Sequence, residues 1–348
     1  MLMNILLNAS FNRSLFVNGL NQNVIFLAEM LKDMGYNISI CVNHDVEECQ
    51  DPPLDILIME EHEIEDYEFD YVLQISWIIK PKIINNLKNK NPRCKNVHVH
   101  YGNRLFTDYN LIASETTMPL SREGVDEIWV SPHYDFSVPY LKTYYRNQKV
   151  FEIPYIWSPK YVHNNNIRYD SNKTKNIAIS EPNLNFTKSC LIPIMAAEEV
   201  VRSNDQLFDL LYCFCTEKYR DKNYFKNLIF PLDLHKKDKI RCVNRYPVET
   251  IFSLCNVLLS HQHYNELNYT HLEALYLDVP LIHNSSLLGG AGYYYPEFNT
   301  ILAGKQLSKA LSLHDENLDH YRKKSKSILW KFSPENELVR DQYKKLFL

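Results

Sequence analysis

The side chains best suited to chemistry lie in polar loops that each follow a short apolar run. Glu273 stands in an amphipathic segment at residues 267–277, after a strand-like run at residues 257–260. A carboxylate can accept hydrogen bonds from two vicinal hydroxyls of a ligand. Lys188 follows another such run, and we expect it in the first turn of a helix over residues 186–202. A lysine there opposes the helix dipole, so a bound diphosphate explains it better than stability does. The alternative for both residues is an ordinary solvated side chain on a helix.

Backbone amides in neighbouring loops would complete a site for a phosphorylated sugar. The glycine turn at residues 289–292 exposes its amides, and a polar loop at residues 14–23 opens the first helix at Gly19. Amides at such positions bind phosphate or sugar oxygens. The residues that we predict to bind a donor molecule are Asn18, Gly19, Glu181, Asn183, Lys188, His261, Asn265, Asn268, Tyr269, Glu273, Gly290 and Gly292.

A second polar group lies in the first half of the chain. His98 and His100 alternate along a strand at residues 96–101, so they share one face of it. The spacing also fits a pair of metal ligands, but no clear third ligand follows, and we predict no metal site. We expect His100 and Asp108 to be catalytic, as a base or an orienter near an acceptor hydroxyl. The residues expected to line the acceptor site are Asn21, Gln22, Asn103 and Arg104.

The composition is that of a globular protein with room for two domains. The chain has 348 residues and a formal net charge of −4, so it lacks the bulk basic character of a nucleic-acid-binding protein. No apolar run approaches the length of a membrane span, and the first residues read as a strand rather than a signal peptide. The 8 cysteines are scattered without zinc spacing. This usage predicts reduced thiols and therefore a cytoplasmic protein.

Strands and helices alternate through two halves of the chain, which predicts an α/β fold of two Rossmann-like domains with parallel sheets facing a cleft. A stretch rich in proline and asparagine separates the halves. We place the first domain at residues 1–155, a linker at 156–175, the second domain at 176–320, and a C-terminal helix at 321–348 that can return to the first domain. We also expect a loop after residue 101, a helix over residues 132–146 and a strand near residues 300–302.

The segment Leu272-Glu273-Ala274, followed by Val279-Pro280, resembles the donor-site helix of GT-B glycosyltransferases. In that family the glutamate at the position of Glu273 holds the ribose of a nucleotide sugar. Asn265 stands where many members carry another glutamate, and Asp278 replaces the usual glycine. The resemblance implies a GT-B fold with the acceptor in the first domain and the nucleotide sugar in the second. It also implies no tightly bound cofactor, with a UDP-sugar as the first choice of co-substrate.

Longer motifs resemble a bacterial and viral family of GT-B-like proteins. They stand at residues 14–28, 181–193, 260–269 and 283–296. A weaker likeness is to phage DNA β-glucosyltransferases, whose donor helix also reads N-x7-E, here Asn265 to Glu273. The catalytic aspartate of those enzymes falls at Gly102 or Asn103 in this chain.

These observations predict a glycosyltransferase that moves a sugar from a nucleotide-sugar donor to an acceptor hydroxyl. The chain has no D-x-D sequence, which favours a metal-independent reaction. One alternative is transfer to hydroxymethylated bases of viral DNA, for which basic runs at residues 80–82, 88–90, 236–237 and 322–324 would form the groove. Others are a non-catalytic sugar- or nucleotide-binding protein and a sugar-nucleotide epimerase. The sequence leaves open the sugar, the base, the acceptor, the stereochemical outcome, and whether the protein is a monomer or a homodimer.

Overall fold

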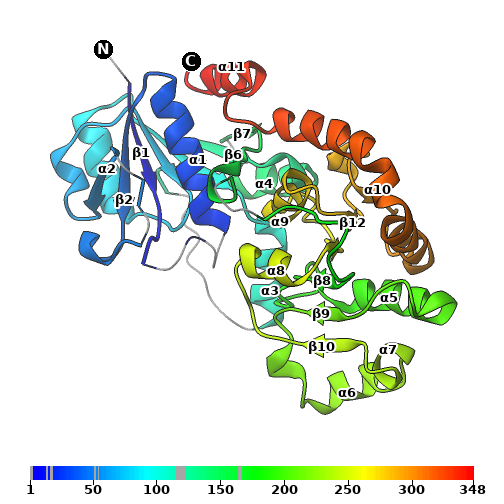
Figure 1. The fold of residues 1–348 in the computed structure, drawn as a ribbon. Helices are drawn as coiled ribbons and strands as arrows, with labels where there is room; N and C mark the ends of the chain where they lie inside the picture. The colour runs from blue at the N-terminus through cyan, green and yellow to red at the C-terminus, as the bar shows by residue number, and fades with distance from the viewer. Residues whose placement is uncertain are drawn as a thin grey trace. The chain divides into compact units, whose positions relative to one another are not determined.

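The structure, a computed structural model, describes residues 3–12, 15, 19–50, 52–53, 55–114, 123–146, 148–163 and 167–348. The chain forms two compact units, one of Met1–Ser158 with Phe332–Leu348 and one of Pro159–Lys331. Each unit is built around one parallel sheet (Figure 1). Among the described residues, no helix combines the length and the apolar character that crossing a membrane requires.

The first unit contains a seven-stranded sheet in the order β3-β2-β1-β4-β5-β6-β7, and the described strands pair in parallel throughout. Central strands such as β1 and β4 are buried almost residue for residue, because both faces of a parallel sheet are covered. The strands are β1 (Asn4–Asn8), β2 (Asn37–Val42), β3 (Leu57–Glu60), β4 (Tyr71–Gln74), β5 (Lys95–His100), β6 (Glu127–Val130) and β7 (Lys149–Glu152).

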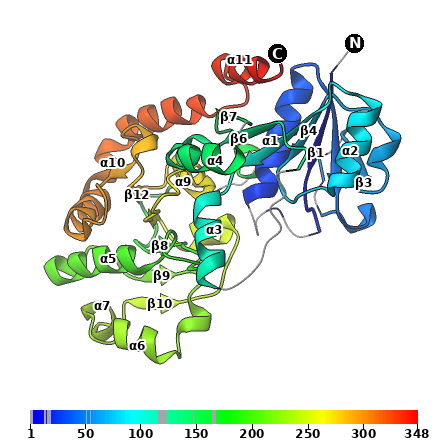
Figure 2. The same cartoon turned by 180° about the vertical axis from the view of Figure 1, so that it is seen from behind.

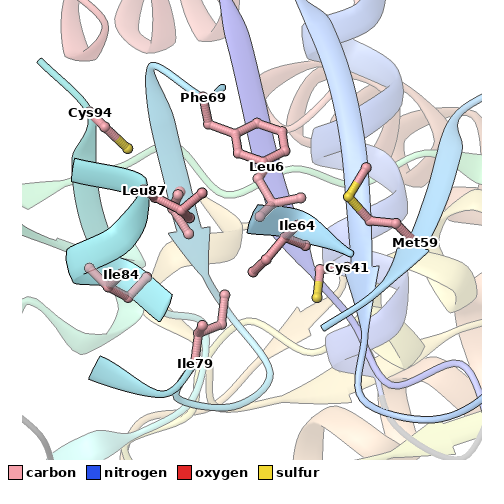
Figure 3. Packing of buried hydrophobic residues seen from close by; sticks show 10 residues of the cluster. Leu6, Cys41, Met59, Ile64, Phe69, Ile79, Ile84, Leu87 and Cys94 are labelled. Atoms are coloured by element: carbon pink, nitrogen blue, oxygen red, sulfur yellow. The ribbon is translucent and has the colours of Figure 1, made fainter. Parts of the chain in front are cut away.

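Helices and short 3₁₀ turns connect these strands. The helices are α1 (Gly19–Asp33), α2 (Pro81–Lys90), α3 (Arg104–Ala113), α4 (Val138–Tyr145) and α11 (Glu337–Leu346), with 3₁₀ turns at Val46–Glu48, Ile64–Asp66 and Pro132–Ser137. Figure 3 shows one core of this unit, in which Ile84 and Leu87 of α2 pack with Leu6 of β1 and Met59 of β3. Burying each such side chain contributes about 1.5–3 kcal/mol, so this cluster fixes α2 on the sheet.

The C-terminal segment completes the same unit. Tyr343 of α11 donates a hydrogen bond to the Pro154 carbonyl at 2.9 Å, and its hydroxyl lies 3.2 Å from that of Tyr101. The Phe347 ring lies 4.9 Å from the Tyr71 ring and 5.4 Å from the Trp129 ring, both at steep angles. Figure 1 draws α11 in red beside the blue α1. A helix from the far end of the chain therefore closes the core of the N-terminal sheet.

The second unit contains a six-stranded parallel sheet in the order β10-β9-β8-β11-β12-β13. The strands are β8 (Ile177–Ile179), β9 (Leu211–Cys213), β10 (Ile240–Cys242), β11 (Val257–Leu259), β12 (Leu281–His283) and β13 (Tyr293–Tyr294). The helices are α5 (Leu191–Asn204), α6 (Asn223–Ile229), α7 (Asp233–Lys236), α8 (Val248–Leu254), α9 (Tyr269–Tyr276) and α10 (Thr300–Lys331), with 3₁₀ turns at Pro159–Tyr161, Glu217–Tyr219 and Ser286–Leu288.

Helices α5 and α10 lie side by side in both views of the chain (Figure 1, Figure 2). Gly304 of α10 makes this approach possible, since a Cβ there would lie 2.9 Å from Glu199 Cβ and 3.1 Å from the Ala196 carbonyl oxygen. The close packing fixes the start of α10 against the helix that follows β8.

Four local expectations are corrected by the structure. Residues 300–302 begin α10 rather than a strand, and the supposed loop after residue 101 contains α3, whose first turn is capped by Asn103. The helix expected at residues 132–146 is a 3₁₀ turn followed by α4. Helix α5 starts at Leu191, so Lys188 precedes it and does not lie in its first turn. The reason is the Asn183 side chain, which accepts a hydrogen bond from the Cys190 amide at 2.8 Å and keeps the preceding residues in a loop.

The unit boundaries in the structure fall after Ser158 and after Lys331. Residues that we expected in a linker are packed. Ile156 and Trp157 are buried in the first unit, and the Tyr169 amide donates to the Leu277 carbonyl in the second.

Candidate functional site

The second sheet has a topological switch point between β8 and β11. From β8 the chain continues to β9 on one side, and β11 with β12 fills the other side. Ligands of open parallel sheets bind outside the carboxyl ends of the strands at such a point. The loops that leave β8 and β11 therefore form the candidate site of this unit.

Glu181, two residues beyond the end of β8, joins these two loops. Its carboxylate accepts a hydrogen bond from Ser260 Oγ at 2.5 Å and from the His261 amide at 3.3 Å. The amide of the Gln262 side chain donates to the other carboxylate oxygen. Only 1% of the Glu181 surface is exposed. Burial raises the pKa of this carboxyl to about 7, against the hydrogen bond from Ser260 and the positive charge of Lys188, which lower it.

The network continues into α9 and the loop after β12. His271 in the first turn of α9 lies with Nε2 2.7 Å from Ser260 Oγ, and its Nδ1 is buried without a partner among the described residues. Asn265 donates to the side-chain oxygen of Gln262 at 2.9 Å. Asn284 brackets the Gln262 backbone, accepting from its amide and donating to its carbonyl. Polar residues of four segments are thus held in one buried array.

Lys188 lies near this array, in the loop that Asn183 shapes. Asn183 adopts a positive φ of 55° and its backbone amide donates to the Lys188 carbonyl at 3.0 Å. Burial lowers the pKa of the half-buried Lys188 ammonium, the charge of Glu181 raises it, and the nearby charge of Arg245 lowers it. The positive charges of Lys188 and of the exposed Arg245, which lies beyond β10, are therefore close enough to interact beside the switch point. That arrangement suits a polyanion such as a diphosphate.

Aromatic rings flank the same end of the sheet. The ring of Phe298, which is 51% exposed, lies 4.9 Å from the ring of His261 and 4.7 Å from that of His263. His261 Nδ1 lies 3.0 Å from the Tyr295 hydroxyl, while its Nε2 is buried without a partner among the described residues. Burial lowers the pKa of His261 to about 4, so its ring is neutral at pH 7. Rings beside polar groups suit a sugar, which presents both C–H faces and hydroxyls.

Glu273 is buried in α9, with 6% of its surface exposed. Burial first, and the nearby charge of Glu249 second, raise the pKa of its carboxyl to about 8. Its carboxyl makes no hydrogen bond with the described residues. Strongly shifted carboxyls cluster at functional sites.

The remaining predicted donor residues differ in position. Asn268 caps α9 by accepting from the Thr270 amide at 3.0 Å, and Tyr269 is buried at the start of that helix. Gly292 enters β13 level with Leu281, at the amino end of β12, because β13 pairs with β12 one residue later. With Gly290 it lies in the turn before β13, where the Ala291 carbonyl lies 2.7 Å from His283 Nε2. Gly19 starts α1 in the first unit, and Asn18 lies outside the described residues.

In the first unit, Asp108 and Arg104 bind each other. They lie one turn apart on α3, with Arg104 Nε 3.0 Å from Asp108 Oδ2, and the Tyr140 hydroxyl donates to the same oxygen at 2.7 Å. His100 ends β5 with its Nε2 buried and unpartnered among the described residues. Burial, with the charges of His98 and Arg104, lowers the pKa of His100 to about 3. At neutral pH His100 is thus an uncharged imidazole, whereas Asp108 is held by two donors.

The other predicted acceptor residues fold their own loops. Asn21 donates to the Ser10 carbonyl at 2.6 Å and Gln22 to the Leu15 carbonyl at 3.3 Å, and both side chains are buried. Asn103 accepts from the Phe106 amide at 3.1 Å as the cap of α3.

Sequence reasoning missed three residues of the array, Ser260, Gln262 and His271, and the cation Arg245 near Lys188. Ser260, Gln262 and His271 lie within eleven positions of His261, so the density of polar side chains between a buried strand and the next helix was the available signal. No such signal in the sequence marked Arg245, because its proximity to Lys188 depends on the pairing of β10, β9 and β8.

No curated protein matches the chain in sequence. Solved structures resemble its fold over nearly the full length. A glycosyltransferase from Rickettsia africae has a TM-score of 0.63 at 15% identity, covering 99% of this chain and 98% of that one. Anabaena HepE, solved with UDP and glucose, has a TM-score of 0.60 at 12% identity, covering 98% and 99%. The BGT of T4 phage, solved with its UDP-glucose substrate, has a TM-score of 0.55 at 13% identity, covering 99% of each chain.

These similarities confirm the predicted GT-B fold of two parallel-sheet units. At these low sequence identities the similarity shows the fold and does not identify the residues of the site. The family model described as "Protein of unknown function (DUF2827)" matches residues 5–347, and the chain therefore belongs to that family.

Proposed function

We propose that this protein is a glycosyltransferase that takes a sugar from a nucleotide-diphosphate donor and transfers it to an acceptor hydroxyl. The observation that carries the proposal is the fold, which is shared over nearly the whole of both chains with a glycosyltransferase and with proteins solved with UDP and glucose or with UDP-glucose. The buried polar array at the switch point of the second sheet supports it, because that is where such sheets bind nucleotides.

In this proposal Lys188 and Arg245 hold the diphosphate and Glu273 holds the ribose. Two cations beside the departing diphosphate stabilise the charge that develops as the glycosidic bond breaks, which is the electrostatic effect that speeds such transfers. The protonated or ionised carboxyl of Glu273 can accept hydrogen bonds from vicinal hydroxyls, and ligand hydroxyls would give it the partners that it lacks. A UDP-sugar is the first donor to test, and independence of metal ions is part of the proposal.

For the acceptor, we assign His100 a more direct role than Asp108. The Asp108 carboxylate already accepts from Arg104 and Tyr140, so it holds α3 and α4 together. The neutral His100 ring has an unpartnered nitrogen that can accept a hydrogen bond from an acceptor hydroxyl.

A DNA acceptor is the second candidate, because the fold also resembles a β-glucosyltransferase described as a DNA-modifying enzyme, over 99% of each chain. The predicted basic groove argues against it, since most of its cations are paired with acids. Lys80 binds Glu61, Lys88 binds Asp126, and Arg322 binds Asp278. Lys236 and Lys237 are likewise paired, with Asp233 and Asp205. A glycan or small-molecule acceptor therefore fits the charge distribution better.

The test is calorimetric titration of UDP and a panel of UDP-sugars into wild type and K188A, with K309A as a control that removes an exposed lysine of α10. We expect UDP to bind wild type and K309A alike and K188A at least about tenfold more weakly, the loss of one charge-assisted interaction. A donor that binds can then be tested for turnover by UDP release with glycan, small-molecule and hydroxymethylated DNA acceptors. Binding without turnover would favour the non-catalytic scaffold, and no binding of any nucleotide or sugar nucleotide would refute the proposal.

A further inference from the structure

The Glu181 side chain is bound by protein groups in a way that contact with the donor would not require. It belongs to the loop after β8, but its three hydrogen-bond donors, from Ser260, His261 and Gln262, belong to the loop after β11. The two loops are about 80 positions apart in sequence. With 1% of its surface exposed, the side chain faces protein and not solvent. Its geometry is that of a clamp between the two loops that flank the switch point.

The hydrogen bonds leave little freedom in this clamp. A serine hydroxyl has one proton, and directed at the Glu181 carboxylate it leaves Ser260 Oγ to accept from His271 Nε2. The proton of His271 is then on Nε2, which agrees with a bare Nδ1. The side-chain oxygen of Gln262 is engaged by Asn265, so its amide group must face Glu181. The polarity of the whole array therefore requires an acceptor at both oxygens of residue 181.

Charge adds a second link between Glu181 and the rest of its own loop. The titratable groups near Glu181 in the described residues are Lys188, Cys190, Cys215, His261, His271 and Tyr295. Burial lowers the pKa of both histidines and raises the pKa of both thiols and of the tyrosine. Burial and the charge of Arg245 lower the pKa of Lys188, and the negative charge of Glu181 raises it.

We infer that Glu181 is a positioning residue for the diphosphate: it clamps the loop that carries Lys188 to the loop after β11. The inference rests on the function proposed above, and it moves Glu181 from the residues that touch the donor to those that hold the donor's ligand in place.

The experiment compares E181Q with E198Q. Glu198 is an equally buried carboxylate of the same unit, accepting from the Asp233 and Leu234 amides at 2.9 and 3.0 Å, in α5. Both carboxylates accept hydrogen bonds on both oxygens, so the NH₂ group of each new glutamine would face a hydrogen-bond donor. Both variants should therefore lose comparable stability. Calorimetric titration uses two probes, UDP and inorganic pyrophosphate, the second of which has neither base nor ribose. We expect E181Q to bind both probes roughly tenfold to hundredfold more weakly than wild type, and E198Q to bind them within about threefold of wild type.

A third variant tests the clamp directly. In E181Q with Q262E, the glutamine at 181 donates to the new carboxylate at 262, and Ser260, His261 and Asn265 all keep an acceptor. The double variant should regain most of the lost pyrophosphate affinity, since it restores every hydrogen bond and moves the charge only to the hydrogen-bonded neighbouring side chain.

The outcomes separate this inference from the function on which it rests. If wild type binds neither UDP nor pyrophosphate, the proposed function itself fails. If wild type binds both, the positioning role is overturned when E181Q binds as wild type does, or when E198Q weakens binding as much as E181Q. A double variant that recovers wild-type stability and yet binds pyrophosphate as poorly as E181Q also overturns it.

Discussion

Replacing Glu273 by glutamine should stabilise the protein, and more so at higher pH. Burial and the charge of Glu249 raise the pKa of Glu273 from its ordinary 4.5 to about 8 in the folded protein. The folded state then binds this proton more tightly than the unfolded state. Stability from this group is full below the ordinary pKa and is lost as the pH rises toward the folded value. Glutamine has nearly the same shape and never ionises, so E273Q does not incur the loss.

The size of the effect follows from the two pKa values. Between them the free energy of unfolding of wild type falls by about 1.4 kcal/mol per pH unit. Integrated from about pH 5.5 to about pH 8, the loss from this one group is about 3 kcal/mol. Because only 6% of the Glu273 surface is exposed, solvent screening reduces this free-energy loss little. Other groups, Glu181 included, titrate in both variants and largely cancel in the difference.

The assay is urea unfolding of wild type and E273Q at both pH values, followed by the fluorescence of the tryptophans and by circular dichroism. The advantage of E273Q in the free energy of unfolding should grow by about 3 kcal/mol from the lower to the higher pH. A third variant, E249Q, removes the like charge that supports the shift, and its own loss of stability with pH should be smaller than that of wild type. Under the proposed function, E273Q should also bind UDP more weakly despite being more stable.

An advantage of E273Q that is the same at both pH values would refute the reasoning, because it would mean that Glu273 ionises in the folded protein as it does in the unfolded chain. Loss of stability in E273Q that deepens with pH would show instead that an ionised Glu273 has a partner that stabilises its charge.

The remaining predictions concern packing. G292A should lower the free energy of unfolding by at least about 3 kcal/mol, because Gly292 has a φ of +75° and a Cβ would lie 2.8 Å from the His283 ring. G290A should lower it by only about 1 kcal/mol, because Gly290 has a φ of +81° but no atom within 4 Å of the added Cβ. Urea unfolding of both variants checks this, and equal losses would contradict the clash. Deleting residues 332–348 should expose the core of the first unit and raise its rate of proteolysis. Y343F, which loses only the contacts of the hydroxyl, should lower the free energy of unfolding by about 1–2 kcal/mol. Wild-type protease resistance of the truncated chain would contradict the role given to α11.

Much of the architecture was available from local patterns. Apolar runs such as residues 3–7 and 257–260 predicted buried parallel strands, because a strand covered on both faces must be apolar along its length. Helix α3 was missed since none of its residues is fully buried, so it presents no apolar stripe to read. Once that helix is known, the spacing of Arg104 and Asp108 by four residues makes their ion pair foreseeable.

The site was predictable only in part. The sequence by itself selected Glu181, Lys188, His261 and Glu273, because polar residues after buried strands fall at the ligand-binding edge of a sheet. Only the tertiary structure decided what each does. It turned Glu181 inward onto Ser260 and Gln262, left Glu273 without a hydrogen bond among the described residues, and placed Arg245 near Lys188. The physical reason is that the pKa of a carboxyl and the partner of a hydrogen bond depend on groups tens of positions away. The order of strands, which no local pattern encodes, brings those groups together.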